Sequence, residues 1–403
     1  MGRAKERYME LQERGYGEVP EKFVCEKCFG DEGLKEFIGN NGERGKCSYC
    51  NDKHNRFYAV ISLEAIIGHI MERISFEWRD AADSGTPYES REGGYLGPTS
   101  DIYDILMDEE PIEAEHSELF NDIVNATFGQ LLARPFAMPY EEMEIQEDWH
   151  LLTQAIKYHA RFIIFHDSAL KIFDKKFYSH LAMPKDTIDE LCSAIERLNL
   201  ITKLDKNIQI YRARHSETKY DDYSSAKDIG TVPSKAANQA NRMSPVGISM
   251  FYGALDTKTA KLEIEADKKS GYIHYGTFFP SRDLVLIDFT KIPFVPSIYS
   301  NRYHLRSDVR LMRDFVKDFS KQILRVNNAE HIEYIPTQVI TEYLRYNFTH
   351  DGKHIDGIIY NSVHKTGKSC VLFVDNDHCV NKNIKSTELC LILDSYCKEE
   401  LQA

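Results

Sequence analysis

Four cysteines near the start of the chain occur as two pairs with the spacing of a metal site. Cys25 and Cys28 form one Cys-x2-Cys pair, and Cys47 and Cys50 form a second pair after 18 intervening residues. Two such knuckles fit the four thiolate ligands of a tetrahedral zinc ion. Because the protein itself fills all four ligand positions, we expect a structural zinc and not a catalytic one. A redox role is less favoured, because no βαβ pattern surrounds either pair.

A second group of reactive residue types lies in the stretch NRMSPVGISMFYGALDTKTAKLEIE at 241–265. It resembles the RES family, whose motif reads roughly Gly-Arg-aromatic-Asn-x-x-Gly-x-x-x-x-Tyr and continues into a helix with Ala-x-x-Glu. The matching positions in this chain are Arg242, Gly247, Tyr252, Ala260 and Glu263. The departures are Asn241 in place of Gly, Met243 in place of an aromatic residue and Ser244 in place of Asn. These changes concern the shape of the expected pocket more than its chemistry.

The resemblance extends over roughly 205–376 in the order expected for the family. YRAR at 211–214 is similar to the opening strand, which makes Arg212 the first family arginine. YIPTQVITEYLR and IDGIIYNSVHKTGKSCVLF are similar to the closing part, with Ser362 at the position of the family serine.

RES domains look like small ADP-ribosyltransferases, and the resemblance implies their chemistry. The activities of the family are NAD hydrolysis, NAD phosphorolysis and protein ADP-ribosylation, and many members are toxins paired with antitoxins. The resemblance therefore implies an enzyme that consumes NAD by cleaving its nicotinamide–ribose bond, acting as a bacterial toxin or defence effector.

Each family position has a side chain suited to that reaction. We expect Glu263, Arg242 and Tyr252 to be catalytic, and Arg212 and Ser362 to bind the substrate. The two arginines suit the pyrophosphate through charge-assisted hydrogen bonds, and the tyrosine suits the flat nicotinamide ring. The carboxylate would stabilise the oxocarbenium-like ribose or orient the attacking oxygen. The serine would bind a phosphate or the nicotinamide amide.

The segment 55–200 resembles the helical HEPN-like domain that precedes RES in some larger proteins. HEPN ribonucleases use Arg-x4–6-His, and Arg161 and His166 have this spacing. Residues five apart on a helix lie on diverging faces, so we favour a regulatory or dimerising scaffold. Two alternatives stay open: a HEPN-type ribonuclease, or a non-catalytic module that senses NAD.

The elements that must position these residues follow from hydrophobic periodicity. Helices are predicted near 57–75, 147–173, 185–201, 257–267, 307–326 and 337–346. Strands are predicted near 208–214, 271–280, 283–290, 355–362 and 369–376. The pattern predicts an α+β protein in three parts: a zinc-binding knuckle (1–55), a helical HEPN-like domain (56–203) and a mixed α+β RES domain (204–403).

Composition narrows the partners of the 403-residue chain. Its net charge of −13 makes nucleic acid an unfavourable partner, because phosphate contacts need clustered Lys and Arg. The longest apolar stretch, 58–70, is short and contains Glu64, which excludes a membrane span there. Without a signal peptide or GxGxxG motif, we expect a cytoplasmic protein that does not use a Rossmann fold. The expected partners are NAD, an antitoxin or regulator, and a second copy bound through the helical domain.

Overall fold

The computed structural model divides the chain into two compact units, which are described separately. The N-terminal unit comprises residues 1–144 and 294–307, and the C-terminal unit comprises residues 145–293 and 308–403. The residues whose structure is described are 14–50, 57–91, 93–127, 129–134, 141–164, 184–265, 270–320, 330–362, 367–382 and 386–401.

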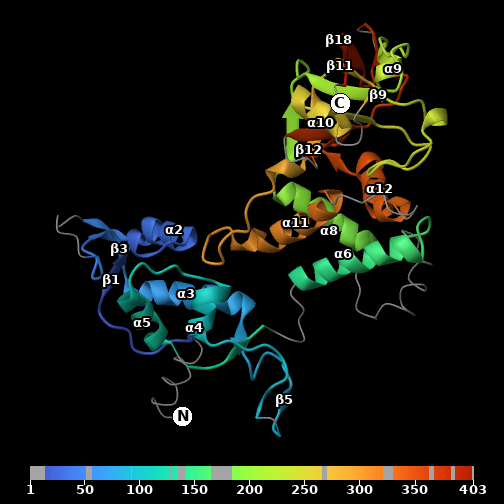
Figure 1. Ribbon diagram of the computed structural model, residues 1–403. Coiled ribbons are helices and arrows are strands. Elements are labelled where there is room, and N and C mark those ends of the chain that lie inside the picture. The colour runs from blue at the N-terminus through green and yellow to red at the C-terminus, as the bar shows by residue number, and fades with distance from the viewer. Residues whose placement is uncertain are drawn as a thin grey trace. The chain divides into compact units, whose positions relative to one another are not determined.

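The N-terminal unit contains short strands and three helices of ten residues or more among its described residues (Figure 1). Its strands are β1 (Phe23–Cys25), β2 (Glu43–Gly45), β3 (Tyr58–Ser62), β4 (Arg79–Asp80), β5 (Tyr88–Glu89), β6 (Gly94–Tyr95) and β7 (Leu132–Ala133). Its helices are α2 (Glu32–Asn41), α3 (Leu63–Glu77), α4 (Ile102–Asp104) and α5 (Ser117–Ala126), with a π-helical turn at Ile105–Glu109.

One hydrophobic core joins the cysteine-bearing segment to the helices of this unit. Val24, Leu34 and Ile38 are fully buried and belong to the same cluster as Ile66 and Ile70 of α3. The side chain of Asp31 caps α2 by accepting a hydrogen bond from the Leu34 amide at 2.9 Å. The segment around the cysteines therefore packs through apolar contacts as well as through any metal.

A short segment from late in the chain, 294–307, belongs to this unit. Tyr299 is 1% exposed, and its hydroxyl donates to the Glu110 carbonyl oxygen at 2.6 Å. The guanidinium of Arg306 forms buried ion pairs with Glu77 at 2.8 Å and with Glu110 at 2.6 Å. Separation of the segment from the unit would leave the charges of these side chains buried without a partner of opposite sign, which is strongly destabilising. These ion pairs therefore hold the segment to the unit.

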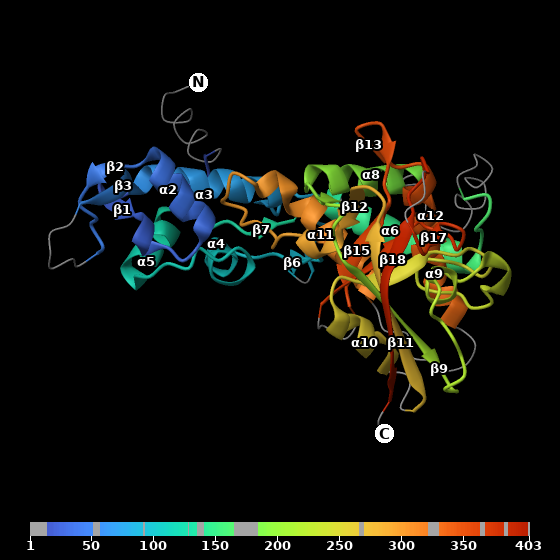
Figure 2. The same ribbon diagram turned by 90° about the horizontal axis from the view of Figure 1, so that it is seen from above.

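Nine described strands of the C-terminal unit form one mixed sheet in the order β17-β18-β11-β9-β10-β16-β15-β12-β8. The β12–β15 and β17–β18 pairs are parallel, and the remaining neighbours are antiparallel. Figures 1 and 2 show β9, β11 and β18 side by side. The strands are β8 (Ile201–Leu204), β9 (Ile210–Ser216), β10 (Phe251–Ala254), β11 (Tyr272–Pro280), β12 (Leu284–Asp288), β15 (Gly357–Asn361), β16 (Lys368–Leu372), β17 (Cys379–Val380) and β18 (Leu391–Glu400). A separate hairpin pairs β13 (Thr349–His350) with β14 (Lys353–His354).

Some helices of the same unit pack directly against the sheet, and others pack against one another. α10 (Thr257–Glu265) packs against β9, β10 and β16. The second group is tied together by contacts between its members, such as the ring contact of Trp149 with Phe315 and the hydrogen bond of Tyr343 to Asp189. The described helices are α6 (Glu141–Tyr158), α8 (Pro184–Arg197), α9 (Ala226–Ile229), α10, α11 (Arg306–Ser320, in this unit from Asp308) and α12 (Glu330–Tyr346).

The predicted α+β class is confirmed, since helices and a large mixed sheet both occur. The run 57–75 is not one helix, because its first residues form strand β3 between β1 and β2 before α3 begins. Among the described helices, none combines the length and the apolar character needed to cross a membrane. The three-part division at 55 and 203 stays a prediction, because compactness alone does not show which segments fold independently.

Candidate active site

A cavity of about 600 Å³ opens in the C-terminal unit among β9, β10, α10, β15 and β16. The segment 232–250 completes its wall with small and polar residues, among them Asn238, Asn241 and Ser249. A volume of this size is in the range of small-molecule sites, which run from about 300 to 1,000 Å³. Three of the five residues predicted to be catalytic or to bind the substrate line it: Arg212, Tyr252 and Glu263.

Arg212 and Arg214 extend from β9 with the two-residue spacing that puts both on one face of a strand. Arg212 donates from Nε to the Ile229 carbonyl oxygen at 2.9 Å and from Nη1 to the Tyr252 carbonyl oxygen. Arg214 donates to the carbonyl oxygens of Ile229 and Gly230, at 3.0 and 2.5 Å. Burial and the charge of Arg214 lower the pKa of Arg212 to about 9, so this guanidinium stays charged at neutral pH.

Two of the carbonyl groups that accept hydrogen bonds from these arginines, those of Ile229 and Gly230, lie at the end of α9, and a neighbouring segment braces the residues on either side of them. Asn376 donates from its amide nitrogen to the carbonyl oxygens of Lys227 and Thr231, at 2.7 and 2.6 Å. Gly230 lies so close to Cys379 that an added Cβ would approach its sulfur to 2.7 Å. A glycine is therefore required where this segment crosses α9.

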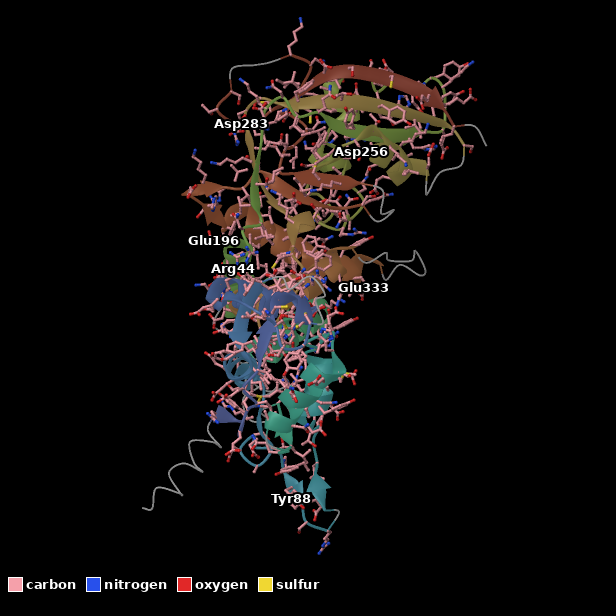
Figure 3. The ribbon with its side chains drawn as sticks, turned by 90° about the vertical axis from the view of Figure 1, so that its left-hand side faces the viewer. Arg44, Tyr88, Glu196, Asp256, Asp283 and Glu333 are labelled. Atoms are coloured by element: carbon pink, nitrogen blue, oxygen red, sulfur yellow. The ribbon has the colours of Figure 1, made fainter. Side chains whose placement is uncertain are left out.

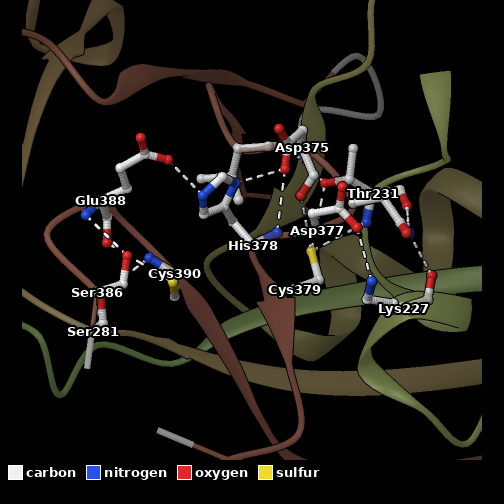
Figure 4. A network of polar contacts seen from close by, with 12 residues as sticks. Lys227, Thr231, Ser281, Asp375, Asp377, His378, Cys379, Ser386, Glu388 and Cys390 are labelled. Carbon is white, nitrogen blue, oxygen red and sulfur yellow. Dashed lines mark hydrogen bonds and ion pairs between the residues drawn. The ribbon is translucent and has the colours of Figure 1, made fainter. Parts of the chain in front are cut away.

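His378 holds the bracing segment to the loop before β18 (Figure 4). Its ring nitrogens lie 2.7 Å from an oxygen of Asp375 and 2.5 Å from an oxygen of Glu388. The hydrogen bond with Asp375 raises the pKa of His378, which favours the cation between the two carboxylates. The network positions the arginines indirectly, since Asn376 of the bracing segment fixes the backbone on either side of the Ile229 and Gly230 carbonyl groups that accept their hydrogen bonds.

The loop that carries Arg242 is fastened to α12. Thr337 donates from Oγ1 to the Arg242 carbonyl oxygen at 2.5 Å, and Gln338 donates from Nε2 to the Asn241 carbonyl oxygen at 2.7 Å. Burial raises the pKa of both Tyr252 and Tyr360, and the positive charge of Arg242 opposes this shift. The guanidinium is therefore close enough to the two cavity tyrosines to act on them electrostatically.

Tyr252 contributes its ring and hydroxyl group to the cavity from β10. Its hydroxyl lies 3.0 Å from the hydroxyl of Ser244, which is buried. Burial raises the pKa of Tyr252 to about 12, so the phenol remains neutral and available for hydrogen bonding at physiological pH. An aromatic face with a neutral hydroxyl suits a flat, amide-bearing heterocycle.

Glu263 faces two serine hydroxyl groups from its position on α10. Ser362 donates to its Oε1 at 2.7 Å, and Ser369 donates to the same oxygen at 3.2 Å. Both serines are nearly inaccessible, with exposed fractions of 2% and 3%. A carboxylate that accepts two such bonds is held in a defined orientation on the cavity wall.

Asp256, labelled in Figure 3, precedes α10 and caps it. Its carboxylate accepts hydrogen bonds from the amide of Thr259 at 2.8 Å and from its hydroxyl at 2.7 Å. The cap satisfies amide donors that the first turn of the helix leaves open. Because the helix carries Glu263 in its last turns, the cap also helps to position that carboxylate.

Replacement of Asp256 by Ala is expected to lower stability by about 1 kcal/mol, the usual cost of losing such a cap. Asp256→Asn is the matched control, since an Asn side chain also accepts from the helix amide. Thermal unfolding of the two variants measures the difference. Equal midpoints for the Ala variant and the wild type would show that the cap contributes nothing.

The remaining sequence-predicted residues lie around the cavity and not on its wall. Ser362 is buried and donates a hydrogen bond to Glu263, and the charge of Arg242 acts electrostatically on Tyr252 in the cavity wall. Tyr360 and Ser369 line the cavity without having been singled out from the sequence. They face each other across β15 and β16, a relation that no local motif of the sequence encodes.

The four paired cysteines form one cluster in the N-terminal unit. Their sulfur atoms all lie within 4.8 Å of one another, and the contacts between neighbouring sulfurs range from 3.3 to 3.8 Å. Four thiolates at about 2.3 Å around a tetrahedral zinc would be separated by about 3.8 Å. The cluster is therefore compatible with a zinc ion bound by Cys25, Cys28, Cys47 and Cys50.

The surroundings of the cluster include one residue that the sequence analysis missed. His116, before α5, places its Nε2 at 3.9 Å from the sulfur of Cys50. The hydrogen bond with Cys25, together with burial, raises the pKa of the Cys28 thiol. A cation at the centre would compensate the charge of four thiolates that otherwise resist ionising together.

Arg161 of the candidate ribonuclease pair has a local structural role. Its guanidinium donates to the carbonyl oxygens of Ile156 at 3.2 Å and of Lys157 at 3.0 Å, at the end of α6. Such contacts satisfy the last carbonyl groups of a helix. His166 lies outside the described residues, so the spacing of this pair stays a sequence observation.

Comparison with protein families agrees with this arrangement. Residues 40–170 match the model "HEPN/RES N-terminal domain 1", and residues 209–394 match the model "RES domain". These matches confirm the resemblances seen in the sequence. No curated protein and no solved structure matches the chain significantly.

Proposed function

The chain carries a RES domain behind a HEPN/RES N-terminal domain, and from this premise we propose that it cleaves the nicotinamide–ribose bond of NAD. The observation that carries the proposal is the orientation of Glu263. Its carboxylate lies on the wall of a cavity large enough for a nucleotide, beside the ring of Tyr252 and the charge of Arg212.

Each cavity residue has a role in this proposal. Arg212 donates to two backbone carbonyl groups from Nε and Nη1, and its other N–H groups bind the pyrophosphate. Arg242 adds a second positive charge. Tyr252 packs against the nicotinamide ring and offers its hydroxyl group to the carboxamide. Ser362 acts through Glu263, since its hydroxyl donates to that carboxylate.

The reaction begins with heterolysis of the bond between nicotinamide and C1 of its ribose. The electron pair leaves with the pyridine nitrogen, and the ribose becomes an oxocarbenium-like cation. The fixed negative charge of Glu263 stabilises this cation, whose charge is largest in the transition state. An acceptor oxygen then bonds to C1 and, where it carries a proton, releases that proton to solvent, which completes the transfer. Water, phosphate or a protein side chain can serve, giving hydrolysis, phosphorolysis or ADP-ribosylation.

Incubation of the purified protein with NAD tests the proposal. Nicotinamide release is the expected result, and mass spectrometry with and without phosphate identifies the acceptor from the mass of the second product. Stable NAD binding without nicotinamide release would instead favour an NAD-sensing module. RNA cleavage without any loss of NAD would favour the HEPN-type ribonuclease.

Two further roles belong to the proposal. We infer that the cysteine cluster binds a structural zinc, because its four sulfurs have the number and spacing that this ion requires.

The proposal also includes a role as a toxin or defence effector. If the protein acts in this way, its expression is expected to lower cellular NAD and to arrest growth. Expression of the Glu263→Gln variant in place of the wild type distinguishes growth arrest caused by NAD loss from arrest with other causes.

A further inference from the structure

We propose that Ser369 is a positioning residue that acts together with Ser362 to fix the carboxylate of Glu263, so that its second oxygen, Oε2, is presented to the ribose. The inference rests on the proposed function. It adds a residue that the family motif does not mark, and it assigns different tasks to the two oxygens of the carboxylate.

Strand pairing puts the two serines on the same face of the hairpin. In the antiparallel pair β15–β16, Tyr360 is directly opposite Ser369, and directly opposed residues point to the same side of a sheet. Ser362 follows Tyr360 by two residues, which returns its side chain to that side. The amide of Ser362 donates to the Gly367 carbonyl oxygen at 2.9 Å and closes the hairpin there. The hydroxyl groups are thus fixed by backbone pairing and not by a flexible loop.

The hairpin also lies directly against the beginning of α10. An added Cβ on Gly367 would lie 2.2 Å from Oγ1 of Thr259 and 2.4 Å from an oxygen of Asp256. Only a residue without a side chain permits this approach. The close contact sets the distance between the strand that carries Ser369 and the helix that carries Glu263.

Both serines bond the same oxygen of Glu263. Ser362 and Ser369 donate to Oε1, at 2.7 and 3.2 Å, and no described residue donates a hydrogen bond to Oε2. Two donors on one oxygen restrict rotation of the carboxylate and leave the other oxygen for a ligand. Ser369 lines the cavity, whereas Ser362 is not among the lining residues, so Ser369 fixes the carboxylate on its substrate side.

Matched variants isolate the hydroxyl group from the volume of the side chain. Ser369→Thr keeps a hydroxyl group. Ser369→Val introduces a side chain with nearly the shape of Thr but without a hydroxyl group. Loss of a hydrogen bond to a charged group predicts that kcat for nicotinamide release falls by about tenfold or more in the Val variant. We expect KM and calorimetric NAD affinity to stay within about twofold, because the orientation matters most in the transition state. The Thr variant should retain most of the wild-type kcat.

Ser395→Val, at an exposed position of β18, is the control for adding Val to a strand of this sheet, and thermal unfolding reports the integrity of all variants. Equal kcat values for the Thr and Val variants would overturn the inference, as would a loss in NAD affinity that accounts for the whole effect. Failure of the wild type to release nicotinamide would overturn the proposed function and this inference with it. The two failures are therefore distinguishable.

Discussion

Replacement of Glu263 by Gln is expected to leave NAD binding near normal while turnover falls by on the order of 10²-fold or more, the usual effect of losing one preorganised electrostatic contact. Gln keeps the size of the side chain and an oxygen that accepts from Ser362 and Ser369. It removes only the negative charge, which matters most when the ribose becomes cationic. The interaction strengthens in the transition state, so its loss lowers kcat more than affinity.

Glu265→Gln is the matched control for this prediction. It lies two residues further along α10, about 200° around the helix axis from Glu263. Its carboxylate lies 3.7 Å from the ammonium group of Lys261 and is 32% exposed. Calorimetry measures NAD binding, and nicotinamide release measures rate. Normal turnover by the Glu263 variant together with impaired turnover by the Glu265 variant would show that the register of the motif is wrong. Normal turnover by both would favour NAD sensing over catalysis.

Replacement of Cys28 by Ser is expected to abolish zinc binding and to unfold the N-terminal unit around the cluster. Cys28 is fully buried, and its sulfur lies within 3.8 Å of the sulfurs of Cys25, Cys47 and Cys50. In small zinc units the metal-binding free energy, about 10–16 kcal/mol in zinc-finger peptides, is folding free energy. The apolar core shared with α2 and α3 should retain part of the structure, so the loss will be smaller than that limit.

Metal analysis of protein purified without added zinc tests the first half of this prediction, with about one zinc per chain expected. Thermal unfolding with and without a chelator tests the second half. Cys397→Ser is the control, because that cysteine is exposed and lies outside the cluster. NAD turnover should survive in the Cys28 variant, since the C-terminal unit has its own hydrophobic core. A folded wild-type protein that contains no metal would contradict the zinc assignment.

Local patterns of the sequence predict most of the elements around the cavity. The strand predicted near 271–280 is β11, the strand near 355–362 is β15, and the helix near 257–267 is α10. Each has a continuous apolar or periodic pattern of its own. β18 was not predicted, although it begins within the apolar run 389–393; its later residues, 394–400, are mostly polar and half of the strand is exposed, so the apolar pattern does not extend over the strand.

Contacts between distant segments are the part that the sequence does not reveal. Glu263 and Ser369 are separated by 106 residues, and they meet only through strand pairing and the approach of Gly367 to α10. The motif spacing indicated that Tyr252 and Glu263 belong to one site, and both line the cavity. The spacing contains no information on which hydroxyl faces which oxygen. The roles assigned to these residues stay predictions, as do the antitoxin, the homodimer and the cytoplasmic location.

The segment 294–307 has a practical consequence for anyone who divides this protein. Because it belongs to the N-terminal unit, the chain passes between the two units three times: after residues 144, 293 and 307. A single proteolytic cut near residue 144 therefore yields the fragments 1–144 and 145–403, and the second fragment keeps the segment 294–307 while its buried partners remain in the first. A fragment that begins at residue 204 would retain Tyr299 and Arg306 but lose their partners Glu77 and Glu110. Such a fragment would expose an aromatic ring and an arginine that the intact chain keeps buried, so poor behaviour of the isolated RES domain would reflect the site of cleavage and not a defect of its own fold.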